Sequence, residues 1–166
     1  MDFSATITHE SAALPGVKFT VRRLNYIARC ERDLRLLDDR ARLTGLMARL
    51  RELGEGGEIG QPRPGAEQEY HKLDAEYAII HQTRIIPAYI RAGLLSVEGF
   101  TVEGAAADTE TILQSAPDAL LDEIFAACYA ASDLSEAQRK NWQSPGSSDA
   151  PEAGPTSGMT APAVNA

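Results

Sequence analysis

The residues of this chain that could bind a metal ion are few. His71 and Asp74 lie three positions apart, a spacing at which two side chains of one helix can share a ligand. A metal site needs a further ligand from a second element, and neither His9 nor His81 can be assigned to the pair from its position in the sequence. We therefore interpret His71 and Asp74 as part of a solvated helix face, and we expect no metal and no other cofactor.

Residues that could catalyse a reaction are equally isolated. Glu98 and Glu103 flank a turn and could pair as acid and base, but nothing else in the sequence supports that role. The glycine-rich run Gly54–Gly60 lacks the Lys-Ser or Lys-Thr that follows a phosphate-binding loop. Cys30 and Cys128 fall within apolar helical patterns and are predicted to be buried thiols. The sequence therefore predicts a protein that is not an enzyme.

The chain is organised around a helix predicted over Arg22–Leu53. This stretch has no proline, and its apolar residues recur three and four positions apart, as on one side of an α-helix. The first stripe consists of Ile27, Cys30, Leu34, Leu37 and Ala41, and the second consists of Leu43, Leu46, Leu50 and Leu53. Ten basic and four acidic residues lie between Lys18 and Arg51, whereas the whole chain has a formal net charge of −8. We expect the arginines of this basic helix to pair with acidic residues of its own and of the next helix.

A further apolar line on this helix is the candidate partner-binding surface. Leu36, Leu43 and Leu50 recur every seven residues, partly off the line through Ile27 and Leu34. Two interpretations of the line remain open. If it is core, a charge placed at Leu36 or Leu43 unfolds the protein, because the charge is buried without a partner. If it is an interface, the fold survives such a change and a partner, or a second copy of the chain, is lost.

The segments around the long helix predict an α+β fold that is mostly α. Alternating apolar residues at Phe3–Thr8 and Val17–Arg22 predict an N-terminal two-stranded β-ribbon. Gly54 ends the long helix, and a flexible glycine-rich connector leads to a second helix from Ala66, so the two helices form a hairpin. Pro87 should kink or break the second helix.

The C-terminal third is predicted to hold short helices and then a tail. Residues 95–102 could form a small hairpin or an irregular loop. Short C-terminal helices are predicted at Thr109–Gln114 behind an Asp108 cap, from Pro117 through Cys128, and from Ser135 to Trp142. Residues 1–142 would thus form a single mainly helical domain. Residues 143–166, rich in Pro, Gly, Ser and Ala, are predicted to be a disordered tail.

Composition and charge restrict the classes of function. The acidic net charge opposes general binding of nucleic acid, so we do not expect DNA or RNA as a partner. The first residues do not resemble a signal peptide, and no apolar run approaches the roughly 20 residues that a membrane-spanning helix needs. We expect a soluble cytoplasmic protein that does not bind membranes.

Two stretches of the sequence together resemble a known family. The first, Pro15–Leu37, is a short strand running into an arginine-rich helix, and the second is Tyr89–Pro145. The matching positions are Tyr89 with Gly93-Leu94, Val97 through Phe100, Pro117 with Leu120 and Glu123-Ile124, and Leu134-Ser135 with Lys140-Asn141. This pattern is similar to that of small proteins encoded in bacteriophage and prophage tail operons, often described as tail assembly chaperones.

The resemblance implies a function without catalysis or cofactor, in the cytoplasm of a bacterial host. It implies that the chain keeps the aggregation-prone tape-measure protein soluble while the phage tail polymerises on it. Binding of a partner helix in an apolar groove would supply the contact. One alternative is a small cytosolic adaptor or regulatory protein that forms a homo-oligomer through the Arg22–Leu53 helix. The other is a small enzyme or ligand-binding domain, whose polar cleft with converging titratable groups the sequence does not indicate.

Overall fold

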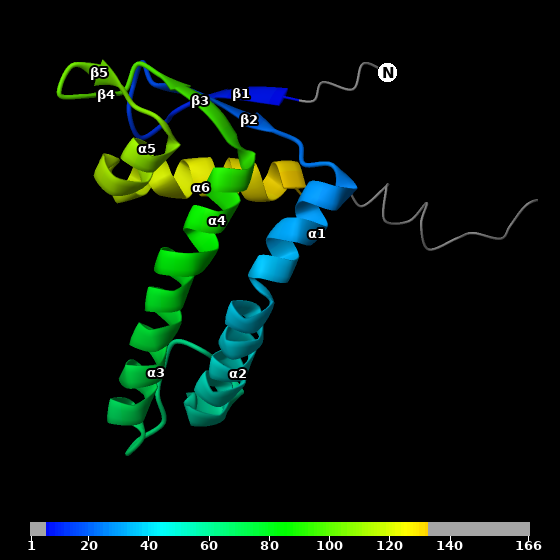
Figure 1. The fold of residues 1–166 in the computed structure, drawn as a ribbon. Helices are drawn as coiled ribbons and strands as arrows, with labels where there is room; N and C mark the ends of the chain where they lie inside the picture. Colours follow the sequence, from blue (N-terminus) through cyan, green and yellow to red (C-terminus); the bar gives the residue numbers. More distant parts are fainter. Residues whose placement is uncertain (1–5, 133–166) are drawn as a thin grey trace, which may run out of the picture. The chain divides into compact units, whose positions relative to one another are not determined.

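The computed structural model describes residues 6–132, which form an α+β unit dominated by helices (Figure 1). This confirms the predicted fold class, an N-terminal β-ribbon followed by helices. The helix predicted at Ser135–Trp142 and the tail predicted at 143–166 lie outside the described residues. Among the residues that are described, no helix is both long enough and apolar enough to cross a membrane.

The N-terminal ribbon has the predicted antiparallel pairing and gains a third strand. Strand β1 (Thr6–Glu10) pairs with β2 (Lys18–Arg22), and β3 (Leu94–Glu98) pairs with the other edge of β2. Phe19 and Val21 on the central strand are buried. A two-stranded ribbon is not stable alone, and the distant strand β3 supplies both hydrogen bonds and apolar cover.

A second, smaller hairpin follows β3. Strands β4 (Thr101–Val102) and β5 (Ala105–Ala106) pair across a turn formed by Glu103 and Gly104. Both turn residues have positive φ, 52° and 81°, as a two-residue hairpin turn of the mirror-image type requires. Residues 95–102 form neither a single hairpin nor an irregular loop. Residues 95–98 belong to the main sheet, and residues 101–102 belong to this second hairpin.

The long helix predicted over Arg22–Leu53 is two helices in the structure. Arg22 ends β2, and α1 (Tyr26–Arg35) begins behind Asn25, whose Oδ1 accepts a hydrogen bond from the Ala28 N–H at 2.8 Å. The helix is interrupted at Leu36, with φ −98° and ψ 4°, and α2 (Leu37–Leu53) follows. The Leu36 side chain is buried in the core below the sheet. Leu36 follows the buried Arg32 by four residues, so the two side chains lie on the same inward side of the helical segment.

Helices α2 and α3 (Glu67–Ile80) form the predicted hairpin and lie side by side (Figure 1). Leu50, Leu53 and Tyr70 form a small core between them. The connector, predicted to be flexible, contains the short helix η1 (Glu55–Gly57) and is held by specific hydrogen bonds. Its Gly60 N–H donates to the Tyr70 hydroxyl at 2.6 Å, and backbone hydrogen bonds close it at Leu53–Arg63 and Glu55–Gln61. The glycines therefore shape a fixed loop.

The chain passes Pro87 without breaking the helical path. After α3, a π-helical turn η2 (His81–Ile85) leads directly into α4 (Ile86–Gly93). In this turn the Ile86 N–H donates to the His81 carbonyl five residues back. Pro87 then stands in the first turn of α4, where its missing N–H is not needed. The predicted disruption is thus absorbed by one wider turn.

The main core lies where the sheet meets α4, α5 (Thr109–Ser115) and α6 (Asp118–Ser132). Asp108 caps α5 as predicted, accepting from the Thr111 N–H at 2.8 Å. The buried apolar residues of α5 and α6 are Ile112, Leu120, Ile124 and Cys128. Helix α6 crosses α4 beneath the sheet (Figure 1), so the main core is completed by the last element of the described chain.

Candidate functional site

The residues considered for chemistry do not converge. His71 and Asp74 are exposed on α3, whereas Glu98 ends β3 and Glu103 lies in the β4–β5 turn, both exposed. Within residues 6–132, no group of three or more His, Cys, Asp or Glu side chains is placed to hold a metal ion.

The two cysteines differ in their surroundings. Cys128 is fully buried, and burial raises the pKa of its thiol to about 12, so it stays protonated and inert at neutral pH. The prediction that Cys30 is buried is wrong, because its side chain is exposed on α1. The reason is the orientation of α1, which turns its apolar stripe outward.

The three candidate partner-binding leucines are used within the domain. Leu36 and Leu50 are 3% and 1% exposed, the first in the main core and the second in the hairpin core. Leu43 is half-buried and packs against the main core. Of the two interpretations that the sequence leaves open, this placement favours core for Leu36 and Leu50, because no partner can reach them in this fold.

A different apolar stripe, the one that begins at Ile27, faces outward. Tyr26, Ile27, Leu34 and Leu37 are between 60% and 73% exposed, among the most exposed large apolar side chains of the described residues. Together with Cys30 they follow one side of α1 and the start of α2, and we call these five residues the α1 face. Side chains of this size present on the order of 500 Å² of mainly apolar surface, as large as the largest patch on a typical monomer.

The inward side of α1 is polar, so the helix is amphipathic in the reverse sense. Arg32 is buried, with its guanidinium carbon 4.0 Å from the centre of the Tyr89 ring. Its Nη2 donates to the Asp33 carboxylate at 2.8 Å, while Nη1 is buried without a hydrogen-bond partner among the described residues. Arg40 donates to the Tyr89 hydroxyl at 2.6 Å and shares the same carboxylate at 3.0 Å. Helix α1 is therefore held to α4 by an arginine on an aromatic ring.

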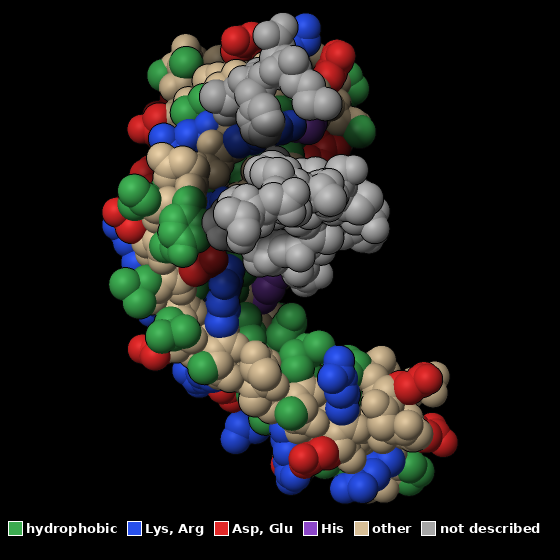
Figure 2. Space-filling view, turned by 90° about the vertical axis from the view of Figure 1, so that its right-hand side faces the viewer, with side chains coloured by type: hydrophobic (Ala, Val, Ile, Leu, Met, Phe, Trp, Pro, Cys, Tyr) green, Lys and Arg blue, Asp and Glu red, His purple; other side chains and the backbone are tan. Residues whose placement is uncertain are grey.

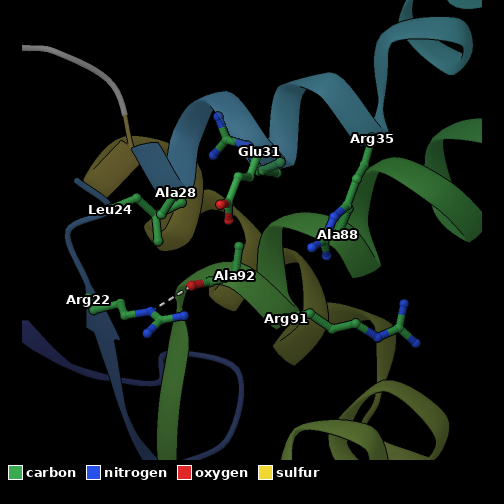
Figure 3. Close-up of a pocket in the computed structure, with 9 residues that line it drawn as sticks. Arg22, Leu24, Ala28, Glu31, Arg35, Ala88, Arg91 and Ala92 are labelled. Atoms are coloured by element: carbon green, nitrogen blue, oxygen red, sulfur yellow. Dashed lines mark hydrogen bonds between the residues drawn. The ribbon is translucent and has the colours of Figure 1, made fainter. Parts of the chain in front are cut away.

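A groove of about 390 Å³ lies between α1 and α4, on the inward side of α1. Alanines at 28, 88 and 92 line it, and Figure 3 shows Arg22, Glu31 and Arg35 turned toward it. The Arg22 Nε donates to the Ala92 carbonyl at 2.7 Å, whereas Arg91 forms two hydrogen bonds with Glu110. The lining is net basic, with four arginines and one acidic residue, Glu31, but two of these arginines, Arg22 and Arg91, are already hydrogen-bonded within the domain.

The basic helix is neutralised in part as predicted. Arg42 pairs with Glu76 at 2.6 Å and Arg49 with Glu69 at 3.1 Å, both across the hairpin. On the face shown in Figure 2, Lys and Arg side chains are interspersed with Asp and Glu over the described residues. A surface of alternating charge does not provide the continuous basic track that binds nucleic-acid phosphates.

The sequence contained the signal for the α1 face but not its orientation. The three-four spacing of Ile27, Cys30, Leu34 and Leu37 identifies a continuous apolar stripe. Such a stripe is more often interior than exposed, and only the buried Arg32 opposite shows that it faces out.

Comparison with known proteins adds no relative: no family model, curated protein or solved structure matches this chain.

Proposed function

We propose that this protein is a non-enzymatic binding protein that receives an α-helix of another protein on the α1 face. The observation that carries the proposal is the reversed amphipathicity of α1, which exposes Ile27 and Leu34 while it buries Arg32. Covering this face removes apolar surface from water, the dominant favourable term in most protein association. The spacing of the exposed residues repeats every seven positions, as in helices that pack along one another.

The charges beside the α1 face indicate the chemistry of the partner. Glu31 and Asp38, seven residues apart and exposed, follow the stripe on one side. In an antiparallel pair of identical helices these acids would oppose each other, which disfavours a second copy of the chain. A partner helix with an apolar stripe flanked by Lys or Arg would instead be attracted. We therefore place a foreign helix ahead of the homo-oligomer of the adaptor alternative.

The resemblance to tail assembly chaperones supports one identity for this helix. In that setting the partner is a segment of the tape-measure protein, which the chain would keep soluble until the tail polymerises around it. The stretch Pro15–Leu37 that carries part of the resemblance contains the whole α1 face. The location of such a complex would be the cytoplasm of the bacterial host.

The test is a pair of matched charge substitutions on exposed apolar residues. Ile27→Glu with Leu34→Glu should leave the melting temperature nearly unchanged and abolish co-purification of a co-expressed tape-measure protein. Ile79→Glu is the control, because Ile79 is also 60% exposed but lies on α3. It should preserve both the fold and the complex.

The other outcomes separate the alternatives. Sedimentation of the protein alone could show a homo-oligomer that Leu34→Glu dissociates. That result would favour the adaptor alternative over the proposal. A complex that survives the double substitution would remove the α1 face as the binding site. Leu36→Glu should unfold the domain, since that leucine is core.

A further inference from the structure

The two sides of the α2–α3 hairpin differ in how their charged side chains are paired. On one side the gap between the helices is closed by the ion pairs Arg42–Glu76 and Arg49–Glu69. On the other side lies a groove of about 490 Å³, lined by Arg40, Leu43, Thr44, Met47, Ala48, Arg51 and Tyr77. No acidic side chain of the described residues lines this second groove, although the protein as a whole is acidic.

The floor of this groove is apolar and its two ends are basic. Leu43, Met47 and Tyr77 are half-buried, so their exposed parts form a continuous apolar strip along the hairpin. Arg40 and Arg51 stand at opposite ends on α2, eleven residues or about 16 Å apart along a helix axis. Among the described residues Arg51 has no carboxylate within ion-pair distance, so its charge is free to meet one from outside.

Aromatic rings extend the floor from the hairpin to α6. Tyr77 stacks on His81, with the ring centres 6.0 Å apart, and His81 meets the Phe125 ring edge-on at 5.6 Å. Phe125 contacts Tyr129, whose ring is about half exposed. Aromatic residues, methionine and arginine are the residue types enriched at the centres of protein interfaces.

We propose that this groove is a second docking site, which binds an acidic amphipathic helix from a partner protein. The apolar floor accepts the helix's Leu or Met side chains, and Arg51 receives one carboxylate. Arg40 already contacts Asp33 and the Tyr89 hydroxyl through Nη2, and it offers its Nε and Nη1 to a second carboxylate three turns away. The site is separate from the α1 face, since no residue is shared between them. Charge complementarity selects the occupant: a basic helix would meet two arginines with no acid between them.

The experiment uses a synthetic capped helical peptide of about 18 residues, long enough to span the groove. Two glutamates eleven positions apart flank leucines placed four and seven positions after the first glutamate. A control peptide of identical composition carries the glutamates four positions closer together. Binding of each to the full-length protein is measured by fluorescence anisotropy in low salt, where such charge pairs are least screened.

The proposal predicts saturable binding of the first peptide and weaker binding of the control. Arg51→Gln should weaken the first complex roughly tenfold, and Met47→Glu should abolish it with the helical circular dichroism retained. Arg42→Gln, on the salt-bridged side of the same helix, should have no effect. Leu34→Glu should also leave the affinity unchanged, which distinguishes this site from the α1 face.

Three results would each overturn the assignment. These are no saturable binding of the first peptide, equal affinity for the two peptides, and an affinity that Arg51→Gln and Met47→Glu leave unchanged.

Discussion

The crossing of α4 and α6 depends on Gly93, the last residue of α4. A Cβ built on Gly93 would lie 2.8 Å from the Cys128 Sγ and 3.0 Å from its Cβ, closer than atoms of these types pack. Cys128 is fully buried and has a short side chain, so it cannot swing away. Ile90, one turn before Gly93 on α4, is fully buried as well, so the two helices cannot separate without opening the core.

Gly93→Ala should therefore destabilise the domain. Overpacking of a tight core site costs about 1–3 kcal/mol. The substitution also restricts the unfolded chain, which offsets about 0.4–1 kcal/mol of that cost. The net loss of about 1–2 kcal/mol corresponds to a fall in Tm of roughly 5 °C. Urea denaturation followed by circular dichroism measures it directly.

Gly45→Ala is the matched control on α2. Nothing lies within 4 Å of a Cβ built there, and the residue is exposed within the helix. The substitution should stabilise the domain by about 0.5–1 kcal/mol, because glycine is a poor helix former. The two Gly→Ala substitutions should therefore change the free energy of unfolding in opposite directions, because an added methyl meets Cys128 at position 93 and meets nothing at position 45.

A double variant tests the cause. Cys128→Ala removes the sulfur that is nearest to the added methyl, so Gly93→Ala with Cys128→Ala should be more stable than the sum of the single effects indicates. If Gly93→Ala were as stable as the unchanged protein, the close approach of α4 and α6 would be refuted. If Cys128→Ala left the destabilisation by Gly93→Ala unchanged, the contact with the sulfur would not be the cause of that destabilisation.

Three further changes test other contacts. Gly99→Ala should be strongly destabilising, because Gly99 has φ 79° and an added Cβ would lie 2.3 Å from the Gly16 carbonyl; a melting curve measures this. Asn25→Ala should cost about 1 kcal/mol by removing the cap of α1, whereas Asn25→Asp should keep it, as urea titrations will show. Ser11 and the N–H groups of residues 12 and 13 donate to Glu123 and hold the pKa of its carboxyl below the ordinary value. Stability from this contact is complete above the unfolded-state pKa and is lost as the pH falls through the folded one, so Glu123→Gln should flatten the acid side of a stability–pH curve.

The sequence by itself determined the local elements and several of their ends. Period-two alternation marked β2, and three-four spacing marked the stripe of α6, because each pattern reflects a helix or strand with one buried side. Asp108 and Gly54 marked the start of α5 and the end of α2 through interactions with their immediate neighbours. These signals are local in the chain, so no tertiary contact is needed to detect them.

Only the tertiary structure decided which side of each element faces the core. The pairing of β3 with β2 joins segments more than 70 residues apart, and no local pattern specifies it. Leu36 packs in the main core on the same side of the segment as Arg32, and the stripe of Ile27 and Leu34 is left outside. Two apolar stripes on one helical segment are equivalent in sequence. They differ in what packs against them, because the burial of Arg32 on Tyr89 fixes the rotation of α1.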